Sequence, residues 1–430
     1  MNKKITAAVM AALMCVSLCT ACGDSASSDD TQSETAAVEE TTAPAAETKV
    51  SITTQAVPTE PVDLEAGVTD TMYERAILNE GNKSRLAAAM EKAENGESIT
   101  VGVIGGSITQ GSLASSSELS YAGLFNQYWC EKFPNAEINY VNAGIGGTTS
   151  YLGVHRVDEQ LLAYEPDVVI VEFSVNDGDK VMNKYSYDSL VRKILNCDSQ
   201  PAVILLFTTM EDGTSLRDTH KEIGFAYDLP MISYHDVVYP EVAAGTLAWT
   251  DISPDNIHPN DAGHDIIGQL ISRYLDSVYD ELDSIDTSDL SFDTAAYTAD
   301  YYADAKLYNA TEIEATEMNG FEVGSNTVYP TMFTDNWVTT SGGSITFDVE
   351  CKCFGLFYVM QTNGKGGTFE VYVDGQRKAV IDSDFSGGWG TYGETTQALL
   401  SKDTEAHTIE IKPAEGSEDA ELTILALMMS

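Results

Sequence analysis

The chain has 430 residues, of which 67 are Asp or Glu and 23 are Lys or Arg, giving a formal net charge of −44 at pH 7. The acidic residues are spread along the chain. This argues against a nucleic-acid-binding protein and against direct docking on an anionic membrane, because both need basic surfaces. The charge suits an exposed, soluble surface.

The N-terminus has the features of an export signal. The basic start Met1–Lys4 precedes an apolar run from Ile5 to Ala21 that is too short to be a membrane span of the mature protein. The stretch Leu18–Cys22 resembles a bacterial lipobox, so residues 1–21 are predicted to be a lipoprotein signal peptide and Cys22 the lipidated residue. We therefore expect the protein on the outer face of a bacterial membrane, held there by an N-terminal lipid. Simple secretion is the alternative.

Residues 22–62 are rich in Ser, Thr, Ala and Glu and contain no aromatic residue. A segment of this composition cannot bury enough apolar surface to offset the entropy of ordering it, so a disordered linker is predicted. The remaining residues, about 370, are too many for one hydrophobic core and indicate two domains. A change of pattern near residue 290 places these domains at 63–290 and 300–430.

In the first domain, apolar strands alternate with amphipathic helices. The strands are expected as continuous apolar runs at 99–105, 138–143, 168–174, 202–208 and 230–235. Helices are expected at 72–95, 120–133, 149–163, 185–196, 215–227 and 261–283. Apolar runs separated by helices predict a parallel sheet covered on both faces, with right-handed crossovers.

In the second domain, apolar residues alternate with polar ones, as in antiparallel strands. The Asp374-Gly375 turn joins two such runs, 368–373 and 377–382, into a predicted hairpin. An all-β, jelly-roll-like sandwich of about 120 residues is therefore expected. Three aromatic residues beside its turns are either candidates for stacking on a sugar ring or core and lid residues: Trp337, Trp389 and Tyr392.

Four cysteines follow the export signal, and their number and spacing indicate neither a disulfide scaffold nor a zinc site. Cys351 and Cys353 share one face of a predicted strand with Phe347 and Val349. They are expected to be small apolar core residues.

Four short motifs in the first domain carry side chains suited to acyl transfer. They are 101–111, where two glycines precede Ser107; the glycine-rich 141–149; 168–177, a buried strand run that ends in Asn176 and Asp177; and 255–260, which places Asp255 three residues before His258. Together they supply a hydroxyl nucleophile, a base, a group to orient that base, and donors for an oxyanion. Taken singly, Ser107, Asp255 and His258 could all be capping residues.

In this interpretation the Ser107 hydroxyl is the nucleophile, His258 is the general base and later the acid, and Asp255 orients the imidazole. The backbone N–H of Ser107 and the amide of Asn176 are oxyanion donors, together with a glycine of the second motif. Asn176 could instead cap the following turn through its side-chain oxygen. Two further histidines at helical apolar positions are expected to be structural: His155 and His264.

Ser107, Gly147, Asn176 and His258, in this order and each in its own motif, resemble the SGNH (GDSL-like) hydrolases over roughly residues 97–280. The resemblance implies a flavodoxin-like three-layer α/β/α fold. It also selects Gly147 as the oxyanion glycine, since Gly147 aligns with the glycine of the family motif. One position departs from the family, because Gly106 stands where the Gly-Asp-Ser motif has aspartate. That aspartate takes no part in the proton relay.

The motifs and the resemblance together predict a serine ester hydrolase that needs no metal and no other cofactor. Surface export and an accessory β domain make O-acetyl groups on polysaccharide the expected substrate, by analogy with bacterial carbohydrate esterases. The alternatives are a lipase, lysophospholipase or thioesterase of the same fold, and a non-catalytic surface glycan-binding lipoprotein. Because all four motifs lie before residue 290, the first domain alone is expected to hydrolyse a small acetyl ester.

Overall fold

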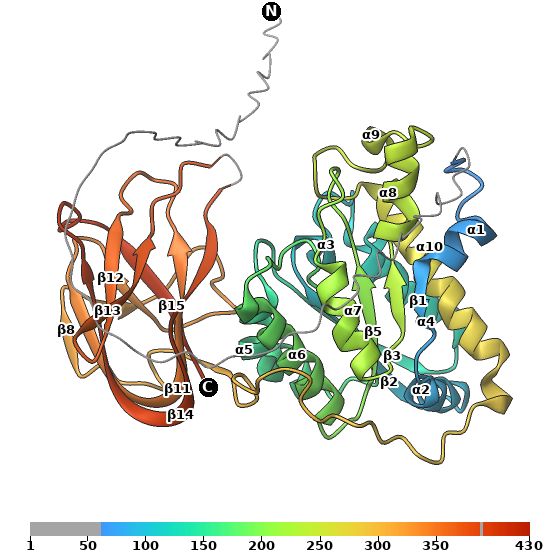
Figure 1. Cartoon of the computed structure of the whole chain (residues 1–430), viewed down its shortest axis with the longest axis horizontal. Coiled ribbons are helices and arrows are strands. Elements are labelled where there is room, and N and C mark those ends of the chain that lie inside the picture. The colour runs from blue at the N-terminus through green and yellow to red at the C-terminus, as the bar shows by residue number, and fades with distance from the viewer. Residues whose placement is uncertain (1–61, 388–389) are drawn as a thin grey trace, which may run out of the picture. The chain divides into compact units, whose positions relative to one another are not determined.

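The computed structural model describes residues 62–387 and 390–430 (Figure 1). The predicted signal peptide, Cys22, all but the last residue of the predicted linker, and Trp389 lie outside the described residues. Across the described ranges, no helix combines the length and the apolar character needed to cross a membrane.

The first domain is built on a sheet whose strands are mostly parallel. Within the described residues the sheet has the strand order β1-β6-β5-β4-β2-β3. All neighbours are parallel except β1, which pairs with β6 in the antiparallel direction. The predicted parallel strands are confirmed, and β1 is an addition that the sequence did not predict. The strands span Ile77–Asn79 (β1), Ser98–Gly105 (β2), Glu137–Gly144 (β3), Val168–Glu172 (β4), Ala202–Phe207 (β5) and Met231–Ser233 (β6).

Helices cover both faces of this sheet (Figure 1). One apolar cluster packs α2, α4 and α10 on one face, and a second packs α5, α6 and α7 on the other. Along β4, Ile170 joins the first cluster and Val171 the second, which is the alternation expected of a strand buried on both faces. The helices span Asp70–Ala76 (α1), Ser84–Glu94 (α2), Ser107–Gln110 (α3), Tyr121–Lys132 (α4), Ser150–Gln160 (α5), Val181–Asn196 (α6), Arg217–Ala226 (α7), His235–Ala244 (α8), Trp249–Ile252 (α9) and Asp261–Asp280 (α10).

The single helix predicted at 72–95 is wrong, because the chain divides there. α1 ends at Ala76, β1 follows, and α2 begins at Ser84. Between them Gly81 has a φ of +64°, and a Cβ at this position would lie 2.2 Å from the backbone nitrogen of Pro230. The left-handed conformation and this close backbone approach both require glycine. The short helices α3, α8 and α9 were not predicted either.

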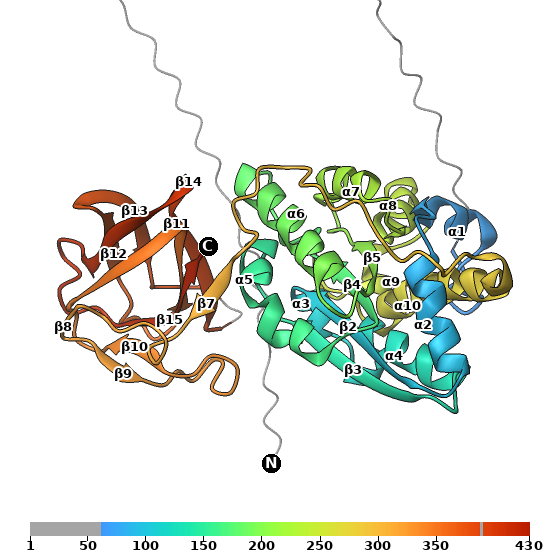
Figure 2. The same cartoon turned by 90° about the horizontal axis from the view of Figure 1, so that it is seen from below.

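Residues 306–429 form an antiparallel β domain (Figure 2), as predicted. Its described strands run in the order β13-β12-β14-β11-β15-β10-β9, with β7 paired to β15 and β8 to β11. Cys351 and Cys353 on β11 are buried, as predicted, and all four cysteines of the described residues are free thiols. The strands span Lys306–Tyr308 (β7), Glu317–Asn319 (β8), Glu322–Gly324 (β9), Asn336–Thr339 (β10), Ser344–Met360 (β11), Thr368–Val373 (β12), Gln376–Asp382 (β13), Tyr392–Pro413 (β14) and Leu422–Met429 (β15).

The two domains share a hydrophobic core. The cluster that covers the α5 and α6 face of the parallel sheet also contains residues of the β domain, among them Phe333, Phe357 and Val359. The hydroxyl of Tyr151 on α5 lies 2.3 Å from where a Cβ would stand at Gly355 of β11, so this contact needs glycine. Removal of the β domain would uncover this buried face, which argues against the expectation that residues before 290 act alone. The domain limits of 63–290 and 300–430 stay predictions.

Candidate active site

Ser107 is presented by the turn that follows β2. A side chain at Gly105 would lie 2.1 Å from Thr109 Oγ1 and 2.4 Å from the carbonyl oxygen of Glu172, so the strand can end this way because the residue is glycine. The chain then enters α3 at Ser107 and leaves it at Gly111, whose φ is +95°. Ser107 therefore stands at the carboxyl edge of the parallel sheet, where open α/β sheets place their ligands.

His258 bridges the Ser107 hydroxyl and the Asp255 carboxylate. Its Nε2 lies 2.9 Å from Ser107 Oγ, and its Nδ1 lies 2.8 Å from Asp255 Oδ2. Because an ionised carboxylate can only accept hydrogen bonds, Nδ1 carries the proton and Nε2 is left to accept the proton of the serine hydroxyl. The structure thus brings the three predicted catalytic residues together in the order that a serine nucleophile needs.

The loop around Asp255 holds this carboxylate in its ionised form. Asp255 Oδ1 accepts the backbone N–H of Ile257 at 2.8 Å and that of His258 at 2.7 Å. Burial alone would raise the pKa of Asp255, but the hydrogen bonds from the His258 ring and from these N–H groups outweigh it and lower the pKa below its ordinary value. The ionised carboxylate stabilises the imidazolium that forms when Ser107 loses its proton.

Gly147 and Asn176 flank Ser107, on the loops after β3 and β4. Gly147 has a φ of +73°. A Cβ at the neighbouring Gly146 would lie 3.5 Å from Ser107 Cβ, which shows how closely this loop approaches the nucleophile. Ser107, Gly147 and Asn176, the three predicted sources of oxyanion donors, line one cleft.

The side-chain oxygen of Asn176 caps nothing. Asn176 Oδ1 is buried and accepts no hydrogen bond from the described residues. A turn cap would need this oxygen to accept a backbone N–H, so the capping alternative is wrong. The amide nitrogen of Asn176 is the group of this side chain that can donate to an oxyanion.

The family motif has aspartate where this chain has Gly106. The position of Asn176 explains why this residue is glycine. A Cβ at Gly106 would lie 2.1 Å from Asn176 Oδ1 and 2.9 Å from Asn176 Nδ2. Any side chain at this position would therefore displace the amide. The departure from the family motif leaves room for an oxyanion donor.

The catalytic residues open into a cleft of about 790 Å³ that residues of both domains line. The first domain contributes Gln110, Leu113 and Ile257 beside the catalytic residues. The β domain contributes four residues, from the loop before β10 and from the start of β14: Val328, Tyr329, Thr391 and Tyr392. The β domain thus forms part of the wall around Ser107.

The three predicted glycan-contacting aromatics have different outcomes. Tyr392 lines the cleft. Trp337 is fully buried, with its ring centroid 5.1 Å from that of Phe347, so a glycan contact there is wrong. The indole belongs to the apolar core of the β domain, which also contains Phe347 and Ile424. Trp389 lies outside the described residues.

Three residues near Ser107 were missed by the sequence reasoning. Gln110 Oε1 accepts the N–H of Gly146 at 2.8 Å, and its place within the Ser107 motif could have indicated it. Leu113 has a φ of +66° yet is 49% exposed at the cleft. A left-handed leucine costs about 1–3 kcal/mol, a strain typical of ligand sites, but no sequence pattern marks it. Tyr329 comes from the β domain, and no sequence pattern marks it as a residue of the cleft.

His155 and His264 are structural, as predicted. His155 is buried and its Nδ1 donates to the carbonyl oxygen of Tyr151 at 2.7 Å. His264 Nδ1 accepts the backbone N–H of Tyr121 at 3.2 Å, and burial lowers the pKa of His264 to about 4. Neither ring is placed to serve Ser107 as a base.

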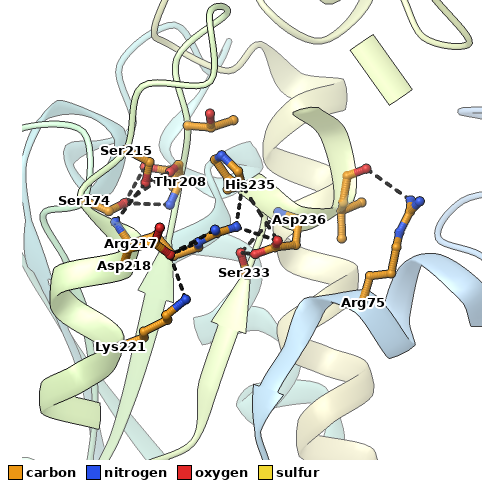
Figure 3. Close-up of polar contacts among 12 residues, drawn as sticks. Arg75, Ser174, Thr208, Ser215, Arg217, Asp218, Lys221, Ser233, His235 and Asp236 are labelled. Carbon is orange, nitrogen blue, oxygen red and sulfur yellow. Dashed lines mark hydrogen bonds and ion pairs between the residues drawn. The ribbon is translucent and has the colours of Figure 1, made fainter. Parts of the chain in front are cut away.

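Glu172, at the end of β4, is a fully buried carboxyl group. Its Oε1 accepts hydrogen bonds from the N–H and the hydroxyl of Ser174, both at 3.0 Å, and from the hydroxyl of Thr208 at 2.8 Å. Figure 3 shows Ser174 and Thr208 side by side. Glu172 Oε2 has no partner among the described residues. Burial outweighs the hydrogen bonds and raises the pKa of Glu172 to about 7.

Glu172→Gln should remove a pH dependence of stability. Between the ordinary pKa of 4.5 and about 7, the folded chain keeps the Glu172 proton that the unfolded chain has lost. The free energy of unfolding therefore falls as pH rises through this window and is level above it. Between pH 4.5 and pH 7.5, the free energy of unfolding of the variant should rise by up to about 3 kcal/mol relative to that of the wild type. Urea unfolding at several pH values measures this, and a difference that is constant with pH would contradict it.

The remaining polar cluster in Figure 3 ties the starts of α7 and α8 to the end of β6. The Arg217 guanidinium lies 2.8 Å from His235 Nδ1 and 2.5 Å from Asp236 Oδ1, and the Ser233 hydroxyl donates to the same Asp236 carboxylate. Among the described residues that line the cleft, none belongs to this cluster. We interpret it as structural.

The chain is similar to known hydrolases. The GDSL-like Lipase/Acylhydrolase family matches residues 103–266. Thioesterase 1/protease 1/lysophospholipase L1 of Escherichia coli (strain K12) is 23% identical over 184 residues, which is 41% of this chain and 83% of that protein. A two-domain esterase (CEX) active on acetylated mannans, co-crystallised with mannopentaose, is 33% identical with a TM-score of 0.77, and the match covers 83% of this chain and 97% of the other. A second structure of such a two-domain esterase matches with the same identity and TM-score, over 98% of its chain.

The match to the two-domain esterase is longer than either domain of this chain, so it extends through both. The match to the bacterial thioesterase is shorter, at 184 residues. The family match at residues 103–266 includes Ser107, Asp255 and His258 of the relay. The chain therefore belongs to the GDSL-like (SGNH) hydrolase family and is a carboxylic ester hydrolase.

Proposed function

We propose that the protein removes O-acetyl groups from a polysaccharide, and that this polysaccharide is of the acetylated mannan type. Ser107 Oγ attacks the acetyl carbonyl while His258 takes the hydroxyl proton, and the sugar alcohol leaves with that proton. Water activated by His258 then releases acetate from Ser107. The N–H groups of Ser107 and Gly147 and the amide of Asn176 stabilise the oxyanion in both steps.

The observation that carries this proposal is the shared cleft. Tyr329 and Tyr392 of the β domain line the same cleft as Ser107. Aromatic rings with a polar tip provide an apolar face and a hydrogen-bonding group, which suits a sugar ring. The similarity to an esterase active on acetylated mannans covers 83% of this chain and therefore extends over both domains. The β domain is proposed to hold the polysaccharide while the relay cleaves its ester.

A second candidate is the hydrolysis of longer acyl esters or thioesters. Three apolar residues, Leu113, Val175 and Ile257, line the cleft and could pack against an acyl chain. The E. coli protein named thioesterase 1/protease 1/lysophospholipase L1 is similar over 41% of this chain.

Two substrate series distinguish these candidates. The first measures kcat/KM for chromogenic esters from acetyl to octanoyl and for a matched thioester. The second measures acetate released from acetylated mannan and acetylated xylan, with Ser107→Ala as the blank. We expect the acetyl ester to be preferred over octanoyl by more than about tenfold, and mannan to be deacetylated fastest. A preference for octanoyl or for the thioester would contradict the proposal.

Tyr392→Ala should affect the polymer more than the small ester. Loss of a ring contact of roughly 0.5–1.5 kcal/mol should raise the KM for acetylated mannan about 2- to 10-fold. The kcat for a small acetyl ester should stay within about twofold, since Tyr392 takes no part in the relay. Tyr164→Ala, at a 58% exposed tyrosine that does not line the cleft, is the matched control. Equal effects of the two variants on the polymer would remove Tyr392 from the binding surface.

We further propose that the protein is anchored outside the cell by a lipid on Cys22, supported by the lipobox-like stretch Leu18–Cys22. Cys22→Ala should move the protein from the membrane fraction to the soluble fraction, because a single lipidated residue provides the anchor. Fractionation without detergent, followed by immunoblotting, measures this. A Cys22→Ala protein that stays with washed membranes would contradict the proposal.

A further inference from the structure

The oxyanion hole depends on two loops that lie on opposite sides of β2. Gly147 is in the loop between β3 and α5, and Asn176 is in the loop between β4 and α6. Oxyanion donors stabilise the transition state when they are fixed before the reaction begins. A misplacement of roughly 1 Å can cost about 10²-fold in rate. The distance between these two loops therefore affects the rate of the reaction.

Asp177 joins the two loops. It follows Asn176 directly, and its Oδ1 accepts the backbone N–H of Ser150, three residues after Gly147, at 2.8 Å. The turn that carries both Asn176 and Asp177 is closed by their N–H groups, which donate to the carbonyl oxygen of Phe173 at 3.1 Å and 2.9 Å. A short path of covalent and hydrogen bonds thus connects the Asn176 amide with the Gly147 loop.

His220 holds Asp177 from the opposite side. His220 Nε2 lies 3.1 Å from Asp177 Oδ2, and neither side chain has any exposed surface. Since the carboxylate accepts, Nε2 carries the proton. The imidazole stacks on the ring of Tyr187 with centroids 3.6 Å apart and planes within 1° of parallel. Its Nδ1 has no partner among the described residues, so the contact with Asp177 is the polar interaction that the ring makes there.

A contribution to stability alone does not explain why Asp177 and His220 are paired in the core. A buried carboxylate–histidine pair costs desolvation, and well-packed apolar residues at such positions are often equally or more stabilising. No hydrogen bond among the described residues links Asp177 or His220 to Ser107 or His258, so the proton relay does not use them either. What the pair does connect is the Asn176 turn, to which Asp177 belongs, and Ser150, the first residue of α5, at the end of the Gly147 loop.

We propose that Asp177 and His220 are positioning residues that set the distance between the Gly147 N–H and the Asn176 amide. Asp177 ties the loops together, and His220, itself fixed by the Tyr187 ring, keeps the Asp177 carboxylate turned toward Ser150. The pair thereby determines how well the hole fits the oxyanion. This inference rests on the proposed function, because it takes Gly147 and Asn176 as the oxyanion donors.

The test compares kcat and KM on a small acetyl ester for Asp177→Ala and His220→Phe. Both should lower kcat roughly 10- to 100-fold with KM within about twofold, because the lost interaction matters in the transition state. Asp177→Asn keeps an oxygen that can accept the Ser150 N–H and should recover most of the kcat. His155→Phe is the matched control, since His155 is also buried and packed against a tyrosine ring, and it should leave kcat near the wild-type value.

A double-mutant cycle separates positioning from a general loss of stability. In an Asn176→Ala background, Asp177→Ala and His220→Phe should lower kcat much less than in the wild type, because the donor they position is gone. A full, multiplicative loss in that background would overturn the inference, and so would wild-type kcat in both single variants. If Asp177→Ala does not fold, Asp177→Ser, whose hydroxyl is too short to bridge both partners, takes its place.

Ser107→Ala, assayed in parallel, keeps the two proposals apart. Activity in Ser107→Ala means that the proposed function is wrong. An inactive Ser107→Ala beside fully active Asp177 and His220 variants means that only the positioning inference is wrong.

Discussion

Ser107→Ala should lower kcat on an acetyl ester by roughly 10⁶-fold, and His258→Ala should lower it nearly as much. The hydroxyl of Ser107 and Nε2 of His258 are 2.9 Å apart and act as one unit, since the hydroxyl is unreactive without the base and the base has no substrate without the hydroxyl. The double variant should therefore be no less active than either single variant. Initial rates at saturating substrate, with folding checked by circular dichroism, measure this.

His407→Ala provides a matched control for the histidine. His407 Nδ1 lies 2.8 Å from Asp374 Oδ2 in the β domain, so it is also a histidine paired with an aspartate, but it is not among the residues that line the cleft. Its replacement should leave kcat unchanged. If the losses in Ser107→Ala and His258→Ala multiply in the double variant, the two residues act independently and the relay is wrong.

Asn176→Ala should lower kcat by roughly 10²–10³-fold with little change in KM, the signature of an interaction made in the transition state. The structure removes the main structural explanation for such a loss, because Asn176 Oδ1 is buried without a hydrogen-bond partner among the described residues. No cap is lost when the side chain is removed.

Asn176→Asp separates the two possible roles of this side chain most sharply. A carboxylate repels the oxyanion and has no N–H to donate, so this variant should be at least as impaired as Asn176→Ala. Aspartate caps turns as well as asparagine does. Near-wild-type kcat in Asn176→Asp would therefore exclude Asn176 from the oxyanion hole.

The parallel sheet could be predicted from the sequence because its central strands, β2, β4 and β5, are short and largely buried on both faces. Every residue of Val168–Glu172 is buried, and the strand appears in the sequence as the continuous apolar run 168–171 before Glu172. The division of the helix predicted at 72–95 could not be predicted, because it depends on the distant Pro230, whose backbone approaches Gly81. Long-range contacts of this kind override local helical spacing.

The catalytic side of the site could be predicted because each residue sits in a local motif at a strand end or in a short loop. The relay from Asp255 to His258 spans three residues, and Ser107 follows two glycines. The opposite wall could not be predicted, because Tyr329 and Tyr392 reach the cleft through packing between domains. The same limit explains the error at Trp337, since aromatic residues near turns give no sign of whether they face the core.

The central claim is that Ser107 carries the acetyl group during turnover. The most direct measurement is rapid acid quenching of the enzyme during hydrolysis of an excess of acetyl ester, followed by peptide mass spectrometry. We predict an added acetyl group on the peptide that contains Ser107, present during turnover, lost after substrate is exhausted, and absent in Ser107→Ala. Turnover without acetylation of Ser107 in a quench that captures the pre-steady-state burst, or transient acetylation of a different residue, would contradict it.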